Sequence, residues 1–426
     1  MNALLNALRV AKNIAAWKIN AVTRESCELF YVQKKVETIR ATDTVDYSVT
    51  VYIDKDGKRG QSTFSAYPYM GEEEISKLID EAVFAAGFTL NKFFELPKPE
   101  DAEIHEGASN LAEKPFKETI GEIGKAIMKA NCVENGSLSA TEIFLYKTTK
   151  HVVNSNGVDV ASTSYECRIE TIPNFVHGDE EVELYQEITF SEFNPDELTA
   201  KVAETLKLCK DRSIAIPMPK VDVLPVIIQD EEAAQFFGEF IYDLSYRTAF
   251  SHANRFNPGD DIQQNPTGDT LDVEMRSIVE GALQSSSVDE DGVILSPAKI
   301  IESGKAVARF GSFRFGYYLG EEHPTGSIPV AFVKEGTMEE ADFKKAPYLR
   351  CVRFSGMQCD LMAGFFGGEV RLGYYFDGEK EIPVTGLSIQ GNLLEAKDTA
   401  RFSKQRVTLE SYSGPKYIYV PNVKIS

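Results

Sequence analysis

"DYSVTVYIDKDGKRGQSTFSA", residues 46–66, predicts two strands joined by a tight turn. Apolar side chains alternate with polar ones over residues 46–53, which is typical of a strand with one buried face. Asp56 and Gly57 form the residue pair that tight hairpin turns favour. Residues 58–66 are therefore expected to return antiparallel to the first strand.

The segments around this hairpin predict a unit made of a helix, four strands and a helix. Residues 1–18 place apolar side chains on one helix face. Residues 71–88 form a second predicted helix, with glutamates in its first turn, where they suit the helix dipole. The strand-like runs between the helices are 27–34, 35–42, 46–53 and 58–66. An antiparallel sheet needs cover for its apolar face, which the two helices can provide.

The same order of elements recurs further along the chain, which indicates a duplication. Residues 115–130 and 194–209 are predicted helices. The strand-like runs between them are 141–148, 150–160, 163–171 and 182–190. The tripeptide Glu-Leu-Phe at 28–30 corresponds to Glu-Ile-Phe at 142–144.

The remaining half of the chain is rich in strand-like and glycine-containing segments. Only residues 231–246 and 390–401 are predicted to be helical there, and residues 305–320 are predicted to be a strand. We therefore predict an α+β fold with three parts. These are an N-terminal unit at 1–105, a second copy at 106–215 and a β-rich C-terminal domain at 216–426.

Composition excludes several classes of function. The formal net charge of −20 and the absence of any Lys/Arg run longer than two argue against direct nucleic-acid binding. The longest apolar runs are about six residues, against roughly 18 for a membrane span. Six scattered cysteines without a CxxC motif favour free thiols in a reducing compartment. We expect a soluble, cytoplasmic protein without a membrane partner.

A second informative stretch is "VIIQDEEAAQFF", residues 226–237, which we call the corner because an apolar strand is predicted to turn there into an amphipathic helix. Asp230, Glu231 and Glu232 fall at the predicted start of that helix. Acidic residues at this position stabilise a helix as caps and against its dipole. A cation site and a general base are the functional alternatives, and the pattern leaves them open.

Motifs of other enzyme classes are missing from the sequence. No two of the five histidines lie within ten residues of each other, and HExxH, GxSxG and phosphate-binding glycine motifs are absent. Cys351 or Cys359 would need a histidine and an orienting group nearby in space to serve as a nucleophile. Neither a metal site nor a nucleophilic site is predicted from these residues.

The chain as a whole resembles the TldD/PmbA family, and in particular its PmbA branch, which is also called TldE. Three stretches carry the resemblance, and the last is the most specific because a glycine-rich run precedes a strand, a "PV.G..I.GN" pattern and a helix. They are residues 32–66, 152–169 and 360–395.

The resemblance implies that the corner corresponds to the zinc-binding motif of related proteins. In the TldD branch, an HExxxH zinc motif lies at the strand-to-helix junction, and a cysteine near the C-terminus completes the ligand set. Residues 230–235 of this chain lie over that motif, so Asp230 and Gln235 stand in place of the histidines and Glu231 in place of the catalytic glutamate. No cysteine follows Cys359. The resemblance therefore implies a degenerate active-site corner, with no catalytic or metal-binding residue and no cofactor in this chain.

The implied function is that of a non-catalytic, metal-free subunit in a cytosolic metallopeptidase that processes unfolded peptides. The implied partner is a TldD-type paralogue that carries zinc, and a homodimer is expected when the chain is alone. The family name "modulator of DNA gyrase" reflects a genetic link, and the charge of −20 argues against DNA contact. Two alternatives remain: an independent hydrolase using Mg²⁺ or Ca²⁺ on Asp230, Glu231 and Glu232, and a non-enzymatic binding or scaffold protein.

Overall fold

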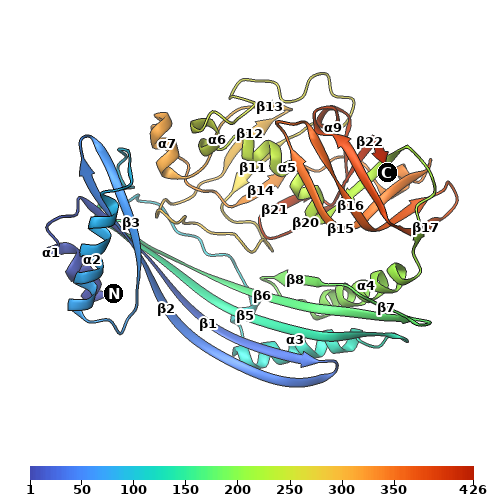
Figure 1. Ribbon diagram of the computed structural model, residues 1–426, viewed down its shortest axis with the longest axis horizontal. Coiled ribbons are helices and arrows are strands. Elements are labelled where there is room, and N and C mark those ends of the chain that lie inside the picture. Colours follow the sequence, from blue (N-terminus) through green and yellow to red (C-terminus); the bar gives the residue numbers. More distant parts are fainter.

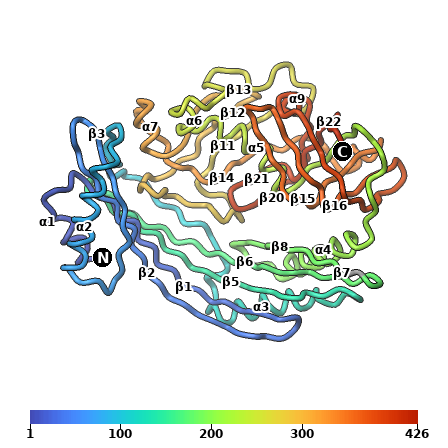
Figure 2. Tube along the Cα trace, in the orientation of Figure 1, coloured from blue at the N-terminus to red at the C-terminus, as the bar shows by residue number. Residues whose placement is uncertain are grey.

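The computed structural model describes residues 1–426, the side chain of Glu180 excepted, and two layers make up the molecule (Figure 1). A long curved sheet, built by the first half of the chain, lies beneath a β-rich C-terminal domain. Figure 2 places the N-terminus at one end of the sheet and the C-terminus inside the upper layer. The predicted α+β fold class is confirmed.

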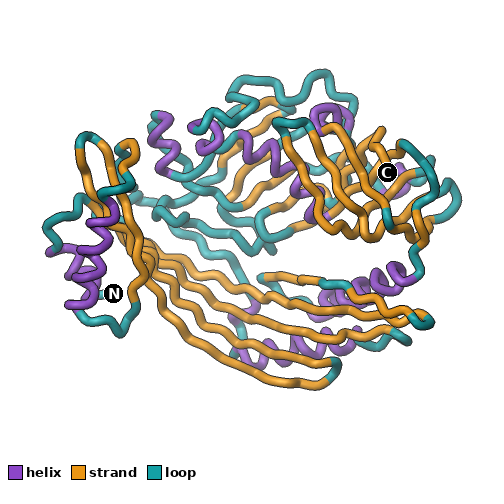
Figure 3. Tube along the Cα trace, in the orientation of Figure 1, coloured by secondary structure: helices purple, strands orange, loops and turns teal.

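The first half of the chain contributes one eight-stranded sheet and the helices that cover it. Its strands are β1 Ala16–Val32, β2 Lys35–Lys55, β3 Lys58–Ala66, β4 Leu90–Lys92, β5 Gly136–Asn154, β6 Asp159–His177, β7 Glu180–Glu183 and β8 Gln186–Phe190. Its helices are α1 Asn2–Val10, α2 Glu72–Ala86, the 3₁₀ turn η1 Asn110–Ala112, α3 Phe116–Ala130 and α4 Pro195–Ser213. Figure 3 shows the long strands running side by side across most of the width of the molecule.

The two predicted copies join through equivalent strands. The sheet order is β4-β3-β2-β1-β5-β6-β7, with β8 also on β6, and β1 and β5 are antiparallel. Leu29 pairs with Ile143, so the tripeptides 28–30 and 142–144 lie opposite each other. Two copies related by a two-fold axis between β1 and β5 would produce this pairing. The duplication itself stays a prediction, which superposition of the two copies tests.

Details of the predicted units differ from the structure. The helix expected over 1–18 ends at Val10, and Ala16 already begins β1. The runs 35–42 and 46–53 form the single strand β2, because no glycine or proline interrupts this β-branched segment. Three long strands therefore lie between α1 and α2, and β4 follows α2. The second unit does have the order helix, four strands, helix.

The two faces of the sheet have different chemistry. Odd-numbered side chains of β1, β5 and β6 pack beneath the helices; Ile19 lies under α1 and α2, whereas Leu29, Ile143 and Ile169 lie under α3 and α4. Side chains alternate along a strand, so the even-numbered ones point to the other face. That face is rich in hydroxyl and charged groups and curves toward the C-terminal domain (Figure 1). We call it the concave face.

The C-terminal domain contains two further sheets. The eight-stranded one consists of β9 Ile216–Pro217, β10 Val223–Gln229, β15 Tyr348–Asp360, β16 Phe365–Phe376, β17 Glu381–Thr385, β18 Leu387–Asn392, β19 Arg401–Phe402 and β22 Tyr417–Ile425. The six-stranded one consists of β11 Val273–Arg276, β12 Ala298–Glu302, β13 Lys305–Ala306, β14 Val330–Val333, β20 Arg406–Thr408 and β21 Tyr412–Pro415. The helices are α5 Asp230–Asp243, α6 Tyr246–Phe250, α7 Phe313–Leu319, α8 Glu340–Phe343 and α9 Leu393–Thr399.

Part of the eight-stranded sheet closes on itself. Strands β15, β10, β22, β18 and β16 follow one another, and a direct β15–β16 pairing completes the ring. Helix α5 contacts β10, β15, β21 and β22, so it packs between this ring and the six-stranded sheet. The corner at 226–237 therefore lies at the centre of the C-terminal domain.

The strand predicted over residues 305–320 is wrong, because residues 313–319 form α7. Aromatic side chains alternate there, but Phe315 and Tyr318 lie one helical turn apart and both pack on Phe250. Gly320 ends the helix with a φ of 84°, a conformation that glycine adopts without a steric penalty. Across the described residues, no helix combines the length and the apolar character that a membrane crossing requires.

Candidate functional site

The corner has the predicted order of strand and helix, with an unusual backbone at the junction. β10 ends at Gln229, and α5 begins at Asp230, whose φ is +52°. Its backbone N–H donates to the carbonyl oxygen of Lys416 at 2.9 Å. Positive φ costs a non-glycine residue roughly 1–2 kcal/mol, although aspartate tolerates it better than most. Such strain is found at active sites and turns, so it marks the corner without identifying its chemistry.

Buried aromatic rings fix the direction of α5. Phe236, Phe237 and Phe240 are at most 1% exposed. The ring of Phe236 lies edge-on to Phe366, and that of Phe237 lies edge-on to Phe402, with centroids 6.1 and 4.9 Å apart. Each such side chain contributes about 1.5–3 kcal/mol by burial. The first turn of α5 is therefore held on a rigid base.

The acidic groups of the first turn experience different surroundings. Burial is the largest influence on Asp230 and raises the pKa of its carboxyl group, against the opposing charge of Lys416. Burial also raises the pKa of Glu232 to about 7, and the neighbouring charge of Glu231 adds to the shift. Glu231 itself is exposed. Glu232 thus exchanges its proton near neutral pH, where catalytic acids and bases work best.

The residues in place of the two histidines do not converge. The Asp230 carboxylate accepts a hydrogen bond from the side-chain amide of Gln229 at 2.9 Å. The Gln235 amide instead donates to the carbonyl oxygen of Met357, on β15, at 3.1 Å. Each side chain is therefore engaged by a different element, and the Glu231 side chain is exposed.

Among the described residues, no three His, Cys, Asp or Glu side chains are grouped so that they could hold a metal ion. The donor set at the corner, an aspartate and a glutamine tied to separate elements, does not fit zinc. That the isolated chain binds no zinc stays a prediction for metal analysis.

The two cysteines that were considered as nucleophiles are placed as structural thiols. Cys351 is 1% exposed, and burial raises the pKa of its thiol. Burial likewise raises the pKa of Cys359 to about 12. A nucleophilic cysteine needs the opposite, a thiolate stabilised at neutral pH. Both groups remain protonated under ordinary conditions.

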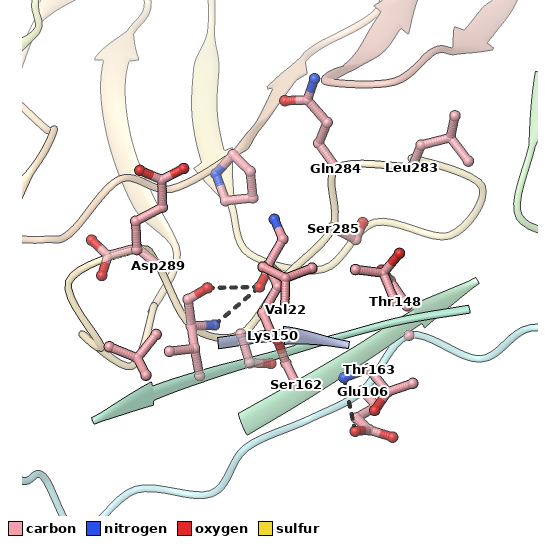
Figure 4. A pocket seen from close by; sticks show the side chains of 18 of the residues that line it. Val22, Glu106, Thr148, Lys150, Ser162, Thr163, Leu283, Gln284, Ser285 and Asp289 are labelled. Atoms are coloured by element: carbon pink, nitrogen blue, oxygen red, sulfur yellow. Dashed lines mark hydrogen bonds between the residues drawn. The ribbon is translucent and has the colours of Figure 1, made fainter. Parts of the chain in front are cut away.

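A second candidate region, which the sequence analysis missed, lies between the two layers. A cavity of about 700 Å³ separates the concave face from the loop at 283–290 (Figure 4). Arg24, Thr148 and Lys150 are among the residues of its floor. The sequence feature that could have indicated this region is the polar character of the even-numbered residues in β1, β5 and β6. Only the three-dimensional structure shows that the loop covers this polar surface.

Comparisons with known proteins identify a matching domain family and several crystal structures with a similar fold. Residues 222–426 match the family model of the PmbA/TldA metallopeptidase C-terminal domain. TldE from Thermococcus kodakarensis has a similar crystal structure, with a TM-score of 0.80 and 15% identity over 100% of this chain and 99% of that one. No curated protein matched the sequence.

Two further crystal structures are of proteins named as modulators of DNA gyrase. The one from Thermotoga maritima has a TM-score of 0.76 and 16% identity, and the match covers 96% of each chain. The one from Bacteroides thetaiotaomicron has a TM-score of 0.79 and 13% identity, over 100% of this chain and 97% of that one. At these identities, the likeness establishes the fold.

Proposed function

We propose that this chain, whose residues 222–426 match the PmbA/TldA metallopeptidase C-terminal domain, is a metal-free subunit of a two-chain metallopeptidase. Its partner is a TldD-type paralogue that carries an HExxxH zinc motif, and its cellular location is the cytoplasm. The enzyme's substrates are unfolded peptides. This chain shapes the space in which the peptide is held, and the paralogue supplies the zinc and the hydrolytic chemistry.

The observation that carries this proposal is the chemistry of the corner. Asp230 and Gln235 replace the two histidines of the motif, and their side chains bond to Gln229 and Met357. Without a metal-bound water, Glu231 has little to activate. The family scaffold is therefore kept, but its ligand set is lost.

The shape of the molecule supports a role in admitting peptides. The concave face runs beneath the C-terminal domain and leaves a cavity of about 700 Å³ there. At the other end of the sheet, β2 pairs with β3 only from Tyr47 onward, so its outer edge over residues 35–46 has no strand partner within the described structure. An extended peptide can add to such an edge through main-chain hydrogen bonds.

Co-purification tests the proposal most simply. The chain is tagged in its native host, and the captured complex is analysed by mass spectrometry and by metal determination. We expect an HExxxH-bearing paralogue in stoichiometric amount, with zinc present in the complex and absent from the separated chain. Zinc that stays with the separated chain and is lost in Glu231→Ala would overturn the proposal.

An independent hydrolase that uses Mg²⁺ or Ca²⁺ is the second candidate, favoured by the carboxyl groups of Asp230 and Glu232 on one helical turn. Both pKa values are raised by burial, so both groups hold protons more tightly than free carboxylates do. A cation would compete with the proton that Glu232 holds near neutral pH. Calorimetry with each metal and the purified chain decides the matter, since micromolar binding that Glu232→Gln abolishes would favour this alternative.

A further inference from the structure

The cavity between the layers has the size and shape of a ligand site. Its volume of about 700 Å³ falls within the range of small-molecule and peptide-end pockets, roughly 300–1,000 Å³. The floor is the concave face of β1, β5 and β6, one wall is the linker at 105–107, and the roof is the loop at 283–290 (Figure 4). Three segments distant in the sequence therefore enclose it.

The roof is held in place by buried polar contacts. Asp289, 8% exposed, accepts hydrogen bonds from the backbone N–H groups of Asp291, Val293 and Ser327. The Lys18 ammonium group of β1 lies 2.5 Å from the Asp291 carboxylate, which ties the roof to the floor.

The roof is also tied to the wall. The backbone N–H of His105 donates to the hydroxyl oxygen of Ser287 at 3.1 Å, and that hydroxyl donates back to the His105 carbonyl oxygen. A site fixed on all sides loses little entropy when it binds a ligand.

The floor presents two cations that no carboxylate neutralises. Arg24 donates from Nε to the Thr148 hydroxyl at 3.3 Å and stacks over the Tyr146 ring at 5.1 Å. Lys150 is exposed, and its cross-strand neighbours are Val22 and Ser162. Among the described side chains, no carboxylate lies within 4 Å of either cation.

The carboxylates around the same cavity form ion pairs, accept backbone hydrogen bonds or are exposed. Arg168 pairs with Glu166 at 3.6 Å and with Glu410 at 3.7 Å. Glu106 accepts the backbone N–H of Thr163 at 3.1 Å. Asp289 is held by the three backbone groups of the roof, and Glu290 is exposed. The lining as a whole carries more carboxylates than cations, and Arg24 and Lys150 are the Lys and Arg side chains in it that no described carboxylate approaches within 4 Å.

Asn20 has a side-chain oxygen that lacks a hydrogen-bond donor. It lines the cavity two residues before Val22 on the same face of β1. Its side-chain oxygen is buried and has no hydrogen-bond partner among the described residues. An unpaired buried acceptor costs about 1–3 kcal/mol, which a ligand N–H would recover. A ligand N–H that reaches this oxygen would satisfy it, and the neighbouring rows of the sheet present two cations for an anion.

We propose that this cavity binds the C-terminal end of a peptide. Lys150 and Arg24 pair with the terminal carboxylate, and Asn20 accepts a main-chain N–H nearby. Along the strands, Asn20 is about two residues, close to 7 Å, from the level of Lys150 and about four residues, close to 13 Å, from Arg24, distances that two to four residues of an extended peptide span. This assignment rests on the proposed function, because it names how the peptide substrate is held.

Calorimetry with the full-length chain and two matched probes tests the assignment. The probes are a 12-residue Gly-Ser-Ala peptide, acetylated at its N-terminus, with either a free C-terminal carboxylate or a C-terminal amide. The carboxylate form is expected to bind at least about tenfold more tightly, the usual scale of one charge-assisted contact. Lys150→Met should remove that preference and leave the circular dichroism spectrum unchanged.

The matched control is Lys147→Met, on the same strand. Lys147 lies on the opposite face, where its ammonium group is 2.7 Å from Glu25, so this variant should keep the preference. Equal binding of both probes would overturn the carboxylate assignment and leave a peptide-binding role intact. Failure of both probes to bind would contradict the peptide function as well. Displacement of the acid probe by inorganic phosphate at equal affinity would also overturn the assignment, by revealing a general anion site.

Discussion

Glu232 is the residue at the corner with the largest consequence for pH dependence. Burial raises the pKa of its carboxyl group to about 7, against 4.5 in the unfolded chain. Below pH 4.5 the group is protonated in both states and contributes no difference. Between pH 4.5 and 7 the unfolded state releases its proton while the folded state keeps it, so the folded state loses stability as the pH rises.

Glu232→Gln should therefore stabilise the protein more at pH 8 than at pH 5.5. We expect a gain on the order of 1–3 kcal/mol at pH 8, seen as a rise of several degrees in the unfolding temperature. Glu231→Gln is the control, because it removes a charge from the same turn at an exposed position and should change little at either pH. A gain for Glu232→Gln that does not depend on pH would contradict the burial argument.

Asp230 allows a test of the strained backbone at the corner. Asn and Val both remove the charge, but asparagine tolerates a φ of +52° and a β-branched side chain does not. Asp230→Val should therefore be less stable than Asp230→Asn by about 1–2 kcal/mol in chemical denaturation. Equal stability of the two variants would mean that the junction relaxes at no cost.

At the scale of residues, the sequence predicted the acidic start of the helix, which the structure confirms, whereas the replacement of the motif histidines by Asp230 and Gln235 stays a prediction. The apolar spacing of Phe236, Phe237 and Phe240 was sufficient to orient α5. It could not predict the burial of Glu232 or the raised pKa, because these depend on β15, more than 100 residues further along the chain. The sequence also could not predict the free cations on the cavity floor, because the cavity forms between segments that are far apart in the sequence.

At the scale of elements, the pairing of β1 with β5 holds the two predicted copies together. Ile143 pairs with Leu29 on the helix-covered face and is 0% exposed, whereas Ile39, near the open end of β2, is 47% exposed. Ile143→Ala should cost about 2–5 kcal/mol, and Ile39→Ala should cost less than about 1 kcal/mol. Thermal unfolding of the two variants checks this difference, and similar losses would contradict the view that the helix-covered face of β1 and β5 forms the core of the sheet.

Alternation and turn residues were enough to predict most of the long strands, because one face of each is apolar. These signals failed where an alternating pattern also fitted a helix, and where a strand pairs with a segment far away in the sequence. The aromatic alternation at 313–319 matched a strand, and only contacts with Phe250 show that it is a helix. The closure of the ring by β15 and β16 depends on pairing between distant segments, which a single sequence does not specify.

At the scale of the whole molecule, we predict a dimer. The open edge of β2 and the half-exposed Val36 and Ile39 beside it leave main-chain and apolar groups available for association. The isolated chain should form a two-fold homodimer whose interface exceeds about 1,000 Å². Sedimentation velocity at micromolar concentration checks this, and a single monomeric species would contradict it.

The peptidase activity of reconstituted mixtures tests the central claim most directly. Unfolded peptide is incubated with this chain, with the zinc-bearing paralogue and with both together, using either wild-type protein or a variant of the active-site glutamate in each chain. We predict hydrolysis only when both chains are present. It should persist with Glu231→Gln in this chain and disappear when the paralogue's zinc-motif glutamate is changed to glutamine. Hydrolysis by this chain alone that survives a chelator, or hydrolysis by the pair that Glu231→Gln abolishes, would contradict the account.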